Sequence, residues 1–125
     1  MTKIKVQADC GNSPKREFLK VFNVAFPKGD TDFIMEHVAE DIQWEMVGLK
    51  TVRGKTEVLQ ELNKGEKAVI REFELSSVIT HGKEASASGE FVLESNKRYK
   101  FCDVYKFQGT KTIIKEIQSF VIEIR

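Results

Sequence analysis

The clearest strand pattern of this chain lies in Arg98-Tyr99-Lys100-Phe101-Cys102-Asp103-Val104-Tyr105-Lys106-Phe107-Gln108-Gly109. Aromatic residues occupy every second position, except where an acid, Asp103, takes their place. Successive side chains of a strand point to opposite faces, so this alternation predicts a half-buried β-strand that turns at Gln108-Gly109. Its inward side chains would be Tyr99, Phe101, Asp103, Tyr105 and Phe107.

The period of two extends on both sides of this stretch. Upstream, two alternating runs predict strands joined by a turn at His81-Gly82-Lys83. Downstream, one more run predicts a final strand, so that three hairpins form a long antiparallel meander. The faces expected to point inward are Phe73, Leu75 and Ile79 on the first strand, Ala85, Ala87, Gly89, Phe91 and Leu93 on the second, and Ile114, Glu116, Gln118, Phe120 and Ile122 on the last.

Before Val69 the apolar residues recur mostly at helical spacing. Ser13-Pro14 is a typical helix start, with Ser as N-cap and Pro in the first helical position, and the helix would end at residues 27–30. A short second helix is expected after Asp30, and a third after a loop from Gly48 to Gly54, with Gly65 as its C-terminal cap. The expected buried positions are Phe18, Leu19, Phe22, Ala25 and Phe26, then Phe33, Ile34 and Val38, then Val58, Leu59 and Leu62.

One strand interrupts the helical part, because Ile42, Trp44 and Met46 alternate with polar residues. Residues 1–12 are polar and irregular, which predicts a tail or a short edge segment. Helices that precede an antiparallel sheet indicate one α+β domain over residues 13–125, with the N-terminal helices packed in a curved antiparallel sheet.

Composition excludes several classes of protein. The chain has 125 residues and a formal net charge of +1, and its basic residues are scattered, so no nucleic-acid or anionic-membrane surface is expected. No apolar run approaches the roughly 20 residues of a membrane span. The start lacks the apolar core of a secretory signal, and Cys10 and Cys102 lie far apart, so we expect a cytoplasmic protein with free thiols. A disulfide between the two cysteines is the alternative.

Three local strings resemble the nuclear transport factor 2-like superfamily, which includes the SnoaL-like domains. Residues 29–44 resemble the family's passage from its second helix into its first strand. Val52-Arg53-Gly54-Lys55-Thr56-Glu57 resembles its entry to the third helix, and Asp103-Val104-Tyr105-Lys106-Phe107-Gln108-Gly109 followed by Ile113 resembles its penultimate hairpin. The resemblance spans roughly residues 13–124.

The resemblance implies a cystatin-like cone, in which the sheet curls around the first helix and holds a pocket at its open end. Members of the superfamily include ketosteroid isomerases, polyketide cyclases, dehydratases, epoxide hydrolases and non-catalytic association modules. The implied cavity therefore leaves the chemistry open.

Strand alternation and helix spacing indicate which side chains would line such a cavity. A hollow walled by aromatic groups with a few polar ones would take a small apolar or aromatic molecule, without a cofactor. The expected lining residues are Phe22, Phe26, Trp44, Met46, Phe101, Tyr105, Gln118 and Phe120.

Asp103 and Glu116 are the candidate catalytic residues. Asp103 shares its strand face with aromatic rings, so desolvation should raise its pKa, and a neutral acid can donate a hydrogen bond to a developing oxyanion. The resemblance places Asp103 where ketosteroid isomerases keep such an acid. Glu116 on the next strand could share its proton. The alternative is a structural acid that ties the hairpin together.

Two departures from the family weigh against steroid isomerisation. Met46 stands where the resemblance implies the general base, and Phe22 stands where it implies an oxyanion-binding Tyr. Neither a thioether nor a phenyl ring transfers a proton. His37 and His81 lack neighbouring ligands, so no metal site is expected, and Cys10 is either a reactive thiol near a helix start or a plain tail residue.

The last two expected strands carry apolar groups on both faces, which favours a homodimer that pairs sheet to sheet. The groups assigned to the outer face are Cys102, Val104, Ile113, Ile117 and Val121. Three functions therefore remain open: a small-molecule-binding domain, a cofactor-independent acid/base enzyme of the isomerase, dehydratase or cyclase type that uses Asp103, and a dimeric interaction module.

Overall fold

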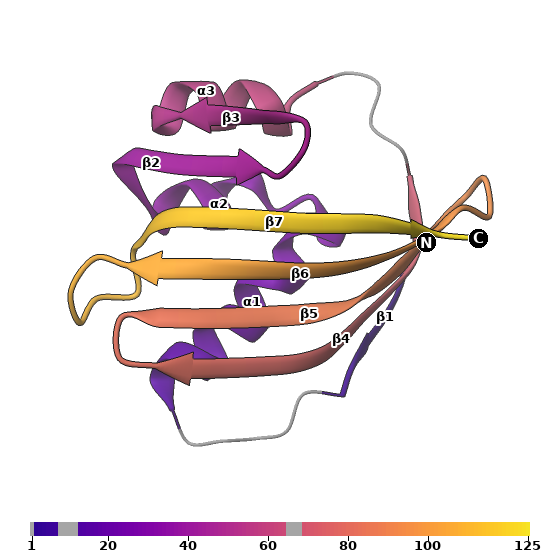
Figure 1. The fold of residues 1–125 in the computed structure, drawn as a ribbon, viewed down its shortest axis with the longest axis horizontal. Helices are drawn as coiled ribbons and strands as arrows, with labels where there is room; N and C mark the ends of the chain where they lie inside the picture. The colour runs from indigo at the N-terminus through magenta and orange to yellow at the C-terminus, as the bar shows by residue number, and fades with distance from the viewer. Residues whose placement is uncertain (1, 8–12, 65–68) are drawn as a thin grey trace.

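The computed structural model describes residues 2–7, 13–64 and 69–125, which form three helices and a seven-stranded sheet. The elements follow one another as β1 (Lys3–Val6), α1 (Pro14–Lys28), α2 (Thr31–Glu36), β2 (Val38–Met46), β3 (Lys50–Arg53), α3 (Gly54–Leu62), β4 (Ile70–His81), β5 (Glu84–Leu93), β6 (Arg98–Phe107) and β7 (Ile114–Ile124). The sheet has the order β1-β4-β5-β6-β7-β2-β3. Figure 1 shows α1 and α2 behind the curved sheet, and α3 beside β3 at one edge.

The predicted α+β cone is confirmed, and the meander from β4 to β7 is antiparallel throughout. The sheet as a whole is mixed, however, because β2 runs parallel to β7 and β1 runs parallel to β4. β1 shows that the N-terminal segment contributes an edge strand instead of remaining only a tail. Among the described residues, no helix is long and apolar enough to cross a membrane.

The prediction of a loop from Gly48 to Gly54 is wrong, because this segment contains β3. Gly48 adopts a φ of 86° in the turn, which lets the chain double back so that Lys50–Arg53 pairs antiparallel with the end of β2. Val52 is buried at the centre of this short strand. Gly65, the expected cap of α3, lies outside the described residues.

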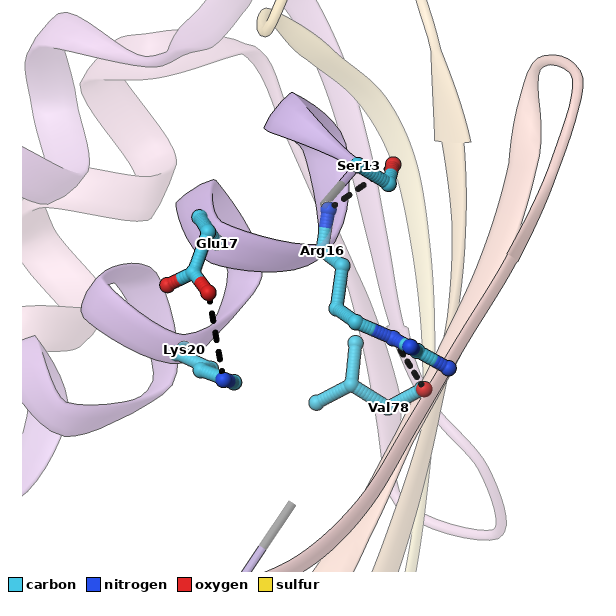
Figure 2. A network of polar contacts seen from close by, with 5 residues as sticks. All are labelled: Ser13, Arg16, Glu17, Lys20 and Val78. Carbon is cyan, nitrogen blue, oxygen red and sulfur yellow. Dashed lines mark hydrogen bonds and ion pairs between the residues drawn. The ribbon is translucent and has the colours of Figure 1, made fainter. Parts of the chain in front are cut away.

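Local contacts fix α1 against β4. Ser13 is the N-cap, as predicted, and its Oγ accepts a hydrogen bond from the Arg16 backbone N–H at 3.4 Å. Figure 2 shows the Arg16 side chain extending to β4, where its Nε donates to the carbonyl oxygen of Val78 at 3.2 Å. An ion pair of 3.3 Å between Lys20 and Glu17 lies one helical turn further along. Gly29 ends the helix in the left-handed conformation.

The core lies between the helices and the concave face of the sheet. Leu19 and Phe22 of α1 are fully buried, as are Ile42, Leu75 and Ile114 of the sheet. The helical apolar pattern is largely confirmed, but Val38, expected on the second helix, is buried at the start of β2. Leu59 of α3 is exposed while its neighbour Val58 faces the core.

A β-bulge in β4 reverses the predicted orientation of its second half. Leu75 pairs with Gly89 and Ser77 with Ser88, so Ser76 is an extra residue on this strand. An extra residue moves every later side chain to the opposite face. Val78 is therefore buried, and the prediction that Ile79 faces inward is wrong, because its side chain is 59% exposed.

A bulge in β7 reverses that strand in the same way. Phe107 of β6 pairs with Ile114, but Lys106 pairs with Glu116, which leaves Lys115 as the extra residue. Ile114 and Glu116 consequently lie on opposite faces, although the alternation had placed them together. The remainder of β7 is reversed relative to the prediction, which changes the inner wall of the cone.

Candidate ligand-binding site

The concave face of the sheet and α1 enclose an open cavity of about 530 Å³. A cavity of this size falls within the range of roughly 300 to 1,000 Å³ that small-molecule sites occupy. α1, β2 and β4 to β7 all contribute to its wall, and the turn between β2 and β3 lies at its rim. The lining residues are Phe22, Asn23, Phe26, Trp44, Met46, Val47, Gly48, Leu49, Ile70, Phe73, Phe91, Phe101, Asp103, Tyr105, Ile117, Ser119 and Val121.

Most of the residues expected on the wall lie there. Phe22 and Phe26 of α1 lie around the hollow together with the two expected side chains of β2 and the three of β6.

 These seven residues are Phe22, Phe26, Trp44, Met46, Phe101, Asp103 and Tyr105.

Glu116, Gln118 and Phe120 do not line the cavity, so their predicted places on its wall are wrong. The bulge at Lys115 turns all three to the convex face of the sheet. Gln118 donates from Nε2 to Glu45 Oε1 at 3.2 Å on that face, and Phe120 is 39% exposed there. Glu116 pairs in register with Lys106 and cannot share a proton with Asp103 inside the cone.

Ile117, Ser119 and Val121 take the inward positions of β7, although the alternation had assigned Ile117 and Val121 to the outer face. Ser119 lies opposite Asp103 in the register of β6 and β7. The sequence carries a signal for this arrangement, because Lys115 and Glu116 place two consecutive charged residues between apolar ones. Such a pair breaks the alternation of a regular strand.

A hydrogen-bonded cluster forms the polar part of the wall. Tyr105 Oη lies 3.3 Å from both Asp103 Oδ2 and Asn23 Oδ1. Asn23 Nδ2 donates to the carbonyl oxygen of Leu19 at 2.9 Å within α1. Ser119 hydrogen-bonds to the Asp103 carboxyl and accepts from Trp44 Nε1 at 3.0 Å. The cluster therefore joins α1, β2, β6 and β7.

Desolvation raises the pKa of Asp103 to about 6, while hydrogen bonds from Ser119 and Tyr105 oppose that rise. Burial also raises the pKa of Tyr105 well above its usual value, and the charge of Asp103 adds to the effect. Tyr105 therefore remains a neutral donor at physiological pH. Asp103 is the member of this cluster that titrates near neutral pH.

The free thiol of Cys102 belongs to the other face of β6. Partial burial and the charge of Asp103 raise its pKa, so it stays protonated near neutral pH. Cys10 lies outside the described residues.

Two proton arrangements are compatible with the cluster. When Asp103 is ionised, Tyr105 and Ser119 can both donate to it, and Asn23 Oδ1 then receives no proton from Tyr105. When Asp103 is neutral, it can donate to Tyr105, whose hydroxyl in turn donates to Asn23. The acid can therefore exchange a proton while its neighbours keep their positions.

Comparison with a family model places most of the chain in a known group. The model described as a SnoaL-like domain matches residues 16–114. No curated protein sequence matches the chain significantly.

Solved structures with similar folds share little sequence with this chain. A candidate ketosteroid isomerase from Kribbella flavida has a TM-score of 0.77 at 12% identity, with 89% of this chain and 79% of that chain covered. An NTF2-like protein of unknown function from Cytophaga hutchinsonii has a TM-score of 0.66 at 23% identity, with 86% and 99% covered. An LEH-like epoxide hydrolase from M. tuberculosis has a TM-score of 0.72 at 14% identity, with 86% and 82% covered. At these identities the similarity establishes the fold alone.

Proposed function

The chain belongs to the SnoaL-like domain family, and we propose that its cone binds a small molecule with an apolar or aromatic body. The observation that carries this proposal is the open cavity of about 530 Å³, whose wall is apolar except for one convergent polar cluster. Apolar walls supply affinity through burial, and a few placed polar groups orient the ligand.

The open space favours ligand binding over an interaction module with a vestigial pocket. In such a module, Trp44, Met46 and the phenylalanines would fill the hollow. Instead, Phe26 and Trp44 meet edge to face at 6.2 Å on one part of the wall, and Phe73 and Phe101 stack at 5.6 Å on another. The rings pack against each other along the wall and leave the centre open.

Acid/base catalysis is a second candidate function, and the raised pKa of Asp103 favours it. A carboxyl group with a pKa of about 6 can donate or accept a proton near neutral pH. Glu116 is no longer a partner, and Tyr105 takes that place as the group hydrogen-bonded to Asp103. Met46 on the wall supplies no base, so steroid isomerisation in the manner of ketosteroid isomerases is not proposed.

Trp44 provides a direct test of binding, because it is the single tryptophan of the chain and lines the cavity. A neutral fluorescent probe such as N-phenyl-1-naphthylamine should bind saturably and accept excitation energy from Trp44. A Val121→Phe variant should weaken binding by about tenfold or more, because the larger side chain enters the cavity.

Ile122→Phe is the matched control, since Ile122 follows Val121 on the same strand but is 68% exposed and does not line the cavity. This variant should bind the probe as the native chain does. If both variants bind with native affinity, or if the native chain does not bind at all, the proposed function is wrong.

A further inference from the structure

Building on the proposed function, we propose that the natural ligand carries a protonated amine, which lies against Asp103 and Asn23 while its apolar body fills the cone. The cavity would then select organic cations over neutral alcohols, and would reject carboxylates. Three features of the wall support this class of ligand: its charge, its hydrogen-bonding capacity and its aromatic rings.

Charge on the wall is entirely negative. Asp103 is the one ionisable carboxylate among the lining residues, and none of them is Lys, Arg or His. The ion pairs found in the described part of the chain do not include Asp103. A partly buried carboxylate without a cationic partner is costly, and a ligand cation would supply that partner. A ligand anion would instead add a second unpaired charge.

Hydrogen bonding in the cluster leaves acceptors available. Asn23 Nδ2 donates to the carbonyl oxygen of Leu19, and Trp44 Nε1 donates to Ser119 Oγ. When Asp103 is ionised, the Tyr105 and Ser119 hydroxyls can both donate to it, which leaves Asn23 Oδ1 and the remaining carboxylate lone pairs to accept. An ammonium group has three donors and no acceptor, so it matches this set. A carbonyl or carboxylate of a ligand would find only the second N–H of Asn23 Nδ2 outside these hydrogen bonds.

Aromatic rings surround the same acid. Tyr105 is hydrogen-bonded to Asp103, and Phe101 lies two residues before Asp103 on the same strand face. Phe22 meets Tyr105 edge to face at 6.1 Å, and Trp44 reaches the cluster through Ser119. Aromatic faces attract cations, more strongly where water is excluded. The body of the ligand and its charge would thus contact one continuous surface.

The proposal fixes the sign of the pH dependence. Asp103 faces Tyr105 on β6, Ser119 on β7 and Asn23 on α1, while the Cys102 thiol lies on the opposite face. None of these four neighbours ionises between about pH 4 and about pH 8, whereas Asp103 does. Amine affinity should therefore fall as pH drops through the pKa of Asp103, by up to about tenfold per unit.

Calorimetric titration of a matched series tests the proposal: 2-naphthylmethylamine, 2-naphthylmethanol and 2-naphthoate. Near neutral pH the amine should bind at least about tenfold more tightly than the alcohol, and the carboxylate most weakly. Asp103→Asn should bring the ratio of amine to alcohol affinity close to one. Glu116→Gln, which removes a carboxylate from the outer face, should leave that ratio unchanged.

The outcomes separate this inference from the proposed function. If the alcohol binds as tightly as the amine, or if Asp103→Asn keeps the preference, the inference is overturned and the proposed function stands. If none of the three compounds binds the native chain, both are overturned. Thermal unfolding of each variant checks that the fold is intact.

Discussion

Asp103 determines the chemistry of the cone at the scale of single residues. It is a carboxyl group placed on the inner face of β6 among aromatic side chains, and desolvation raises its pKa to about 6. The same placement that creates a charged site inside an apolar cavity also makes the folded state sensitive to pH.

Replacement of Asp103 by Asn should stabilise the protein near neutral pH. The folded pKa of about 6 lies above the ordinary value of 3.8, so the native state binds more protons than the unfolded chain between these values. The free energy of unfolding of the native chain should therefore fall relative to that of the variant as pH rises through this window, by up to about 3 kcal/mol.

Urea denaturation of both proteins across this pH range measures the effect. A difference in unfolding free energy that stays constant with pH would contradict the burial of this carboxyl group.

Ser119→Ala should raise the pKa of Asp103 further. The hydrogen bond from Ser119 is the largest influence that lowers this pKa, ahead of the bond from Tyr105. The variant also leaves Trp44 Nε1 without its acceptor, so tryptophan emission should change together with the titration. Carboxyl titration by carbon-13 NMR, compared with Tyr105→Phe, provides the measurement. A smaller rise for Ser119→Ala than for Tyr105→Phe would contradict the assigned order.

At the scale of elements, bulges in β4 and β7 change which side chains reach the site. β4 has an extra residue at Ser76 and β7 has one at Lys115, and each reverses the rest of its strand. Because of the bulge on β7, the polar neighbour of Asp103 on the cavity wall is Ser119 and not Gln118.

Gly89 is a position where β5 lies very close to the backbone of β4. A Cβ atom at Gly89 would lie 2.0 Å from the carbonyl oxygen of Glu74 and 3.1 Å from the ring of Phe101. The first distance is too short for any contact, so the backbone of β4 would have to move. Gly89→Ala should therefore destabilise the fold by about 1–3 kcal/mol or more.

Ser88→Ala on the same strand is the control and should change the unfolding free energy by less than about 0.5 kcal/mol. Thermal or chemical denaturation compares the two variants. Native stability of Gly89→Ala would show that β4 and β5 do not approach as closely as described.

The sequence predicted most of these elements, since alternation and helix caps are local properties. In β5 and β6 the predicted inward residues agree with the structure, because no bulge interrupts the alternation of these strands. The bulges were missed because strict alternation was extended through Leu75-Ser76-Ser77-Val78 and Ile114-Lys115-Glu116-Ile117. Both stretches have the same pattern, in which two polar residues separate two buried ones. Parallel pairing of β2 with β7 depends on contacts distant in sequence and leaves no local pattern.

At the scale of the whole molecule, the convex face of the sheet also requires an explanation. Phe120 and Ile122 of β7 are 39% and 68% exposed, and they pair in register with Cys102 and Lys100 of β6. Burial of such side chains would favour association, so we expect a homodimer through this face. On this face β7 contributes Phe120 and Ile122, whereas the alternation had assigned Ile117 and Val121, which line the cavity.

Light scattering at micromolar concentration should give the mass of two chains. The double variant Phe120→Glu with Ile122→Glu should give the mass of one chain, because it places charges at the expected contact. Val121→Phe, which points into the cone, should remain dimeric. A native chain with the mass of a monomer would contradict the expected interface.

The sheet and α1 enclose a hollow, and Asp103 lies on its wall. Carbon-13 NMR titration of the Asp103 carboxyl group, with and without bound 2-naphthylmethylamine, measures whether this group is desolvated inside the hollow. We predict a pKa of about 6 in the free protein and a lower pKa when the amine is bound, because the ligand cation stabilises the ionised form. A pKa near the ordinary value of 3.8, unchanged by the amine, would show that this carboxyl group does not lie desolvated inside the hollow.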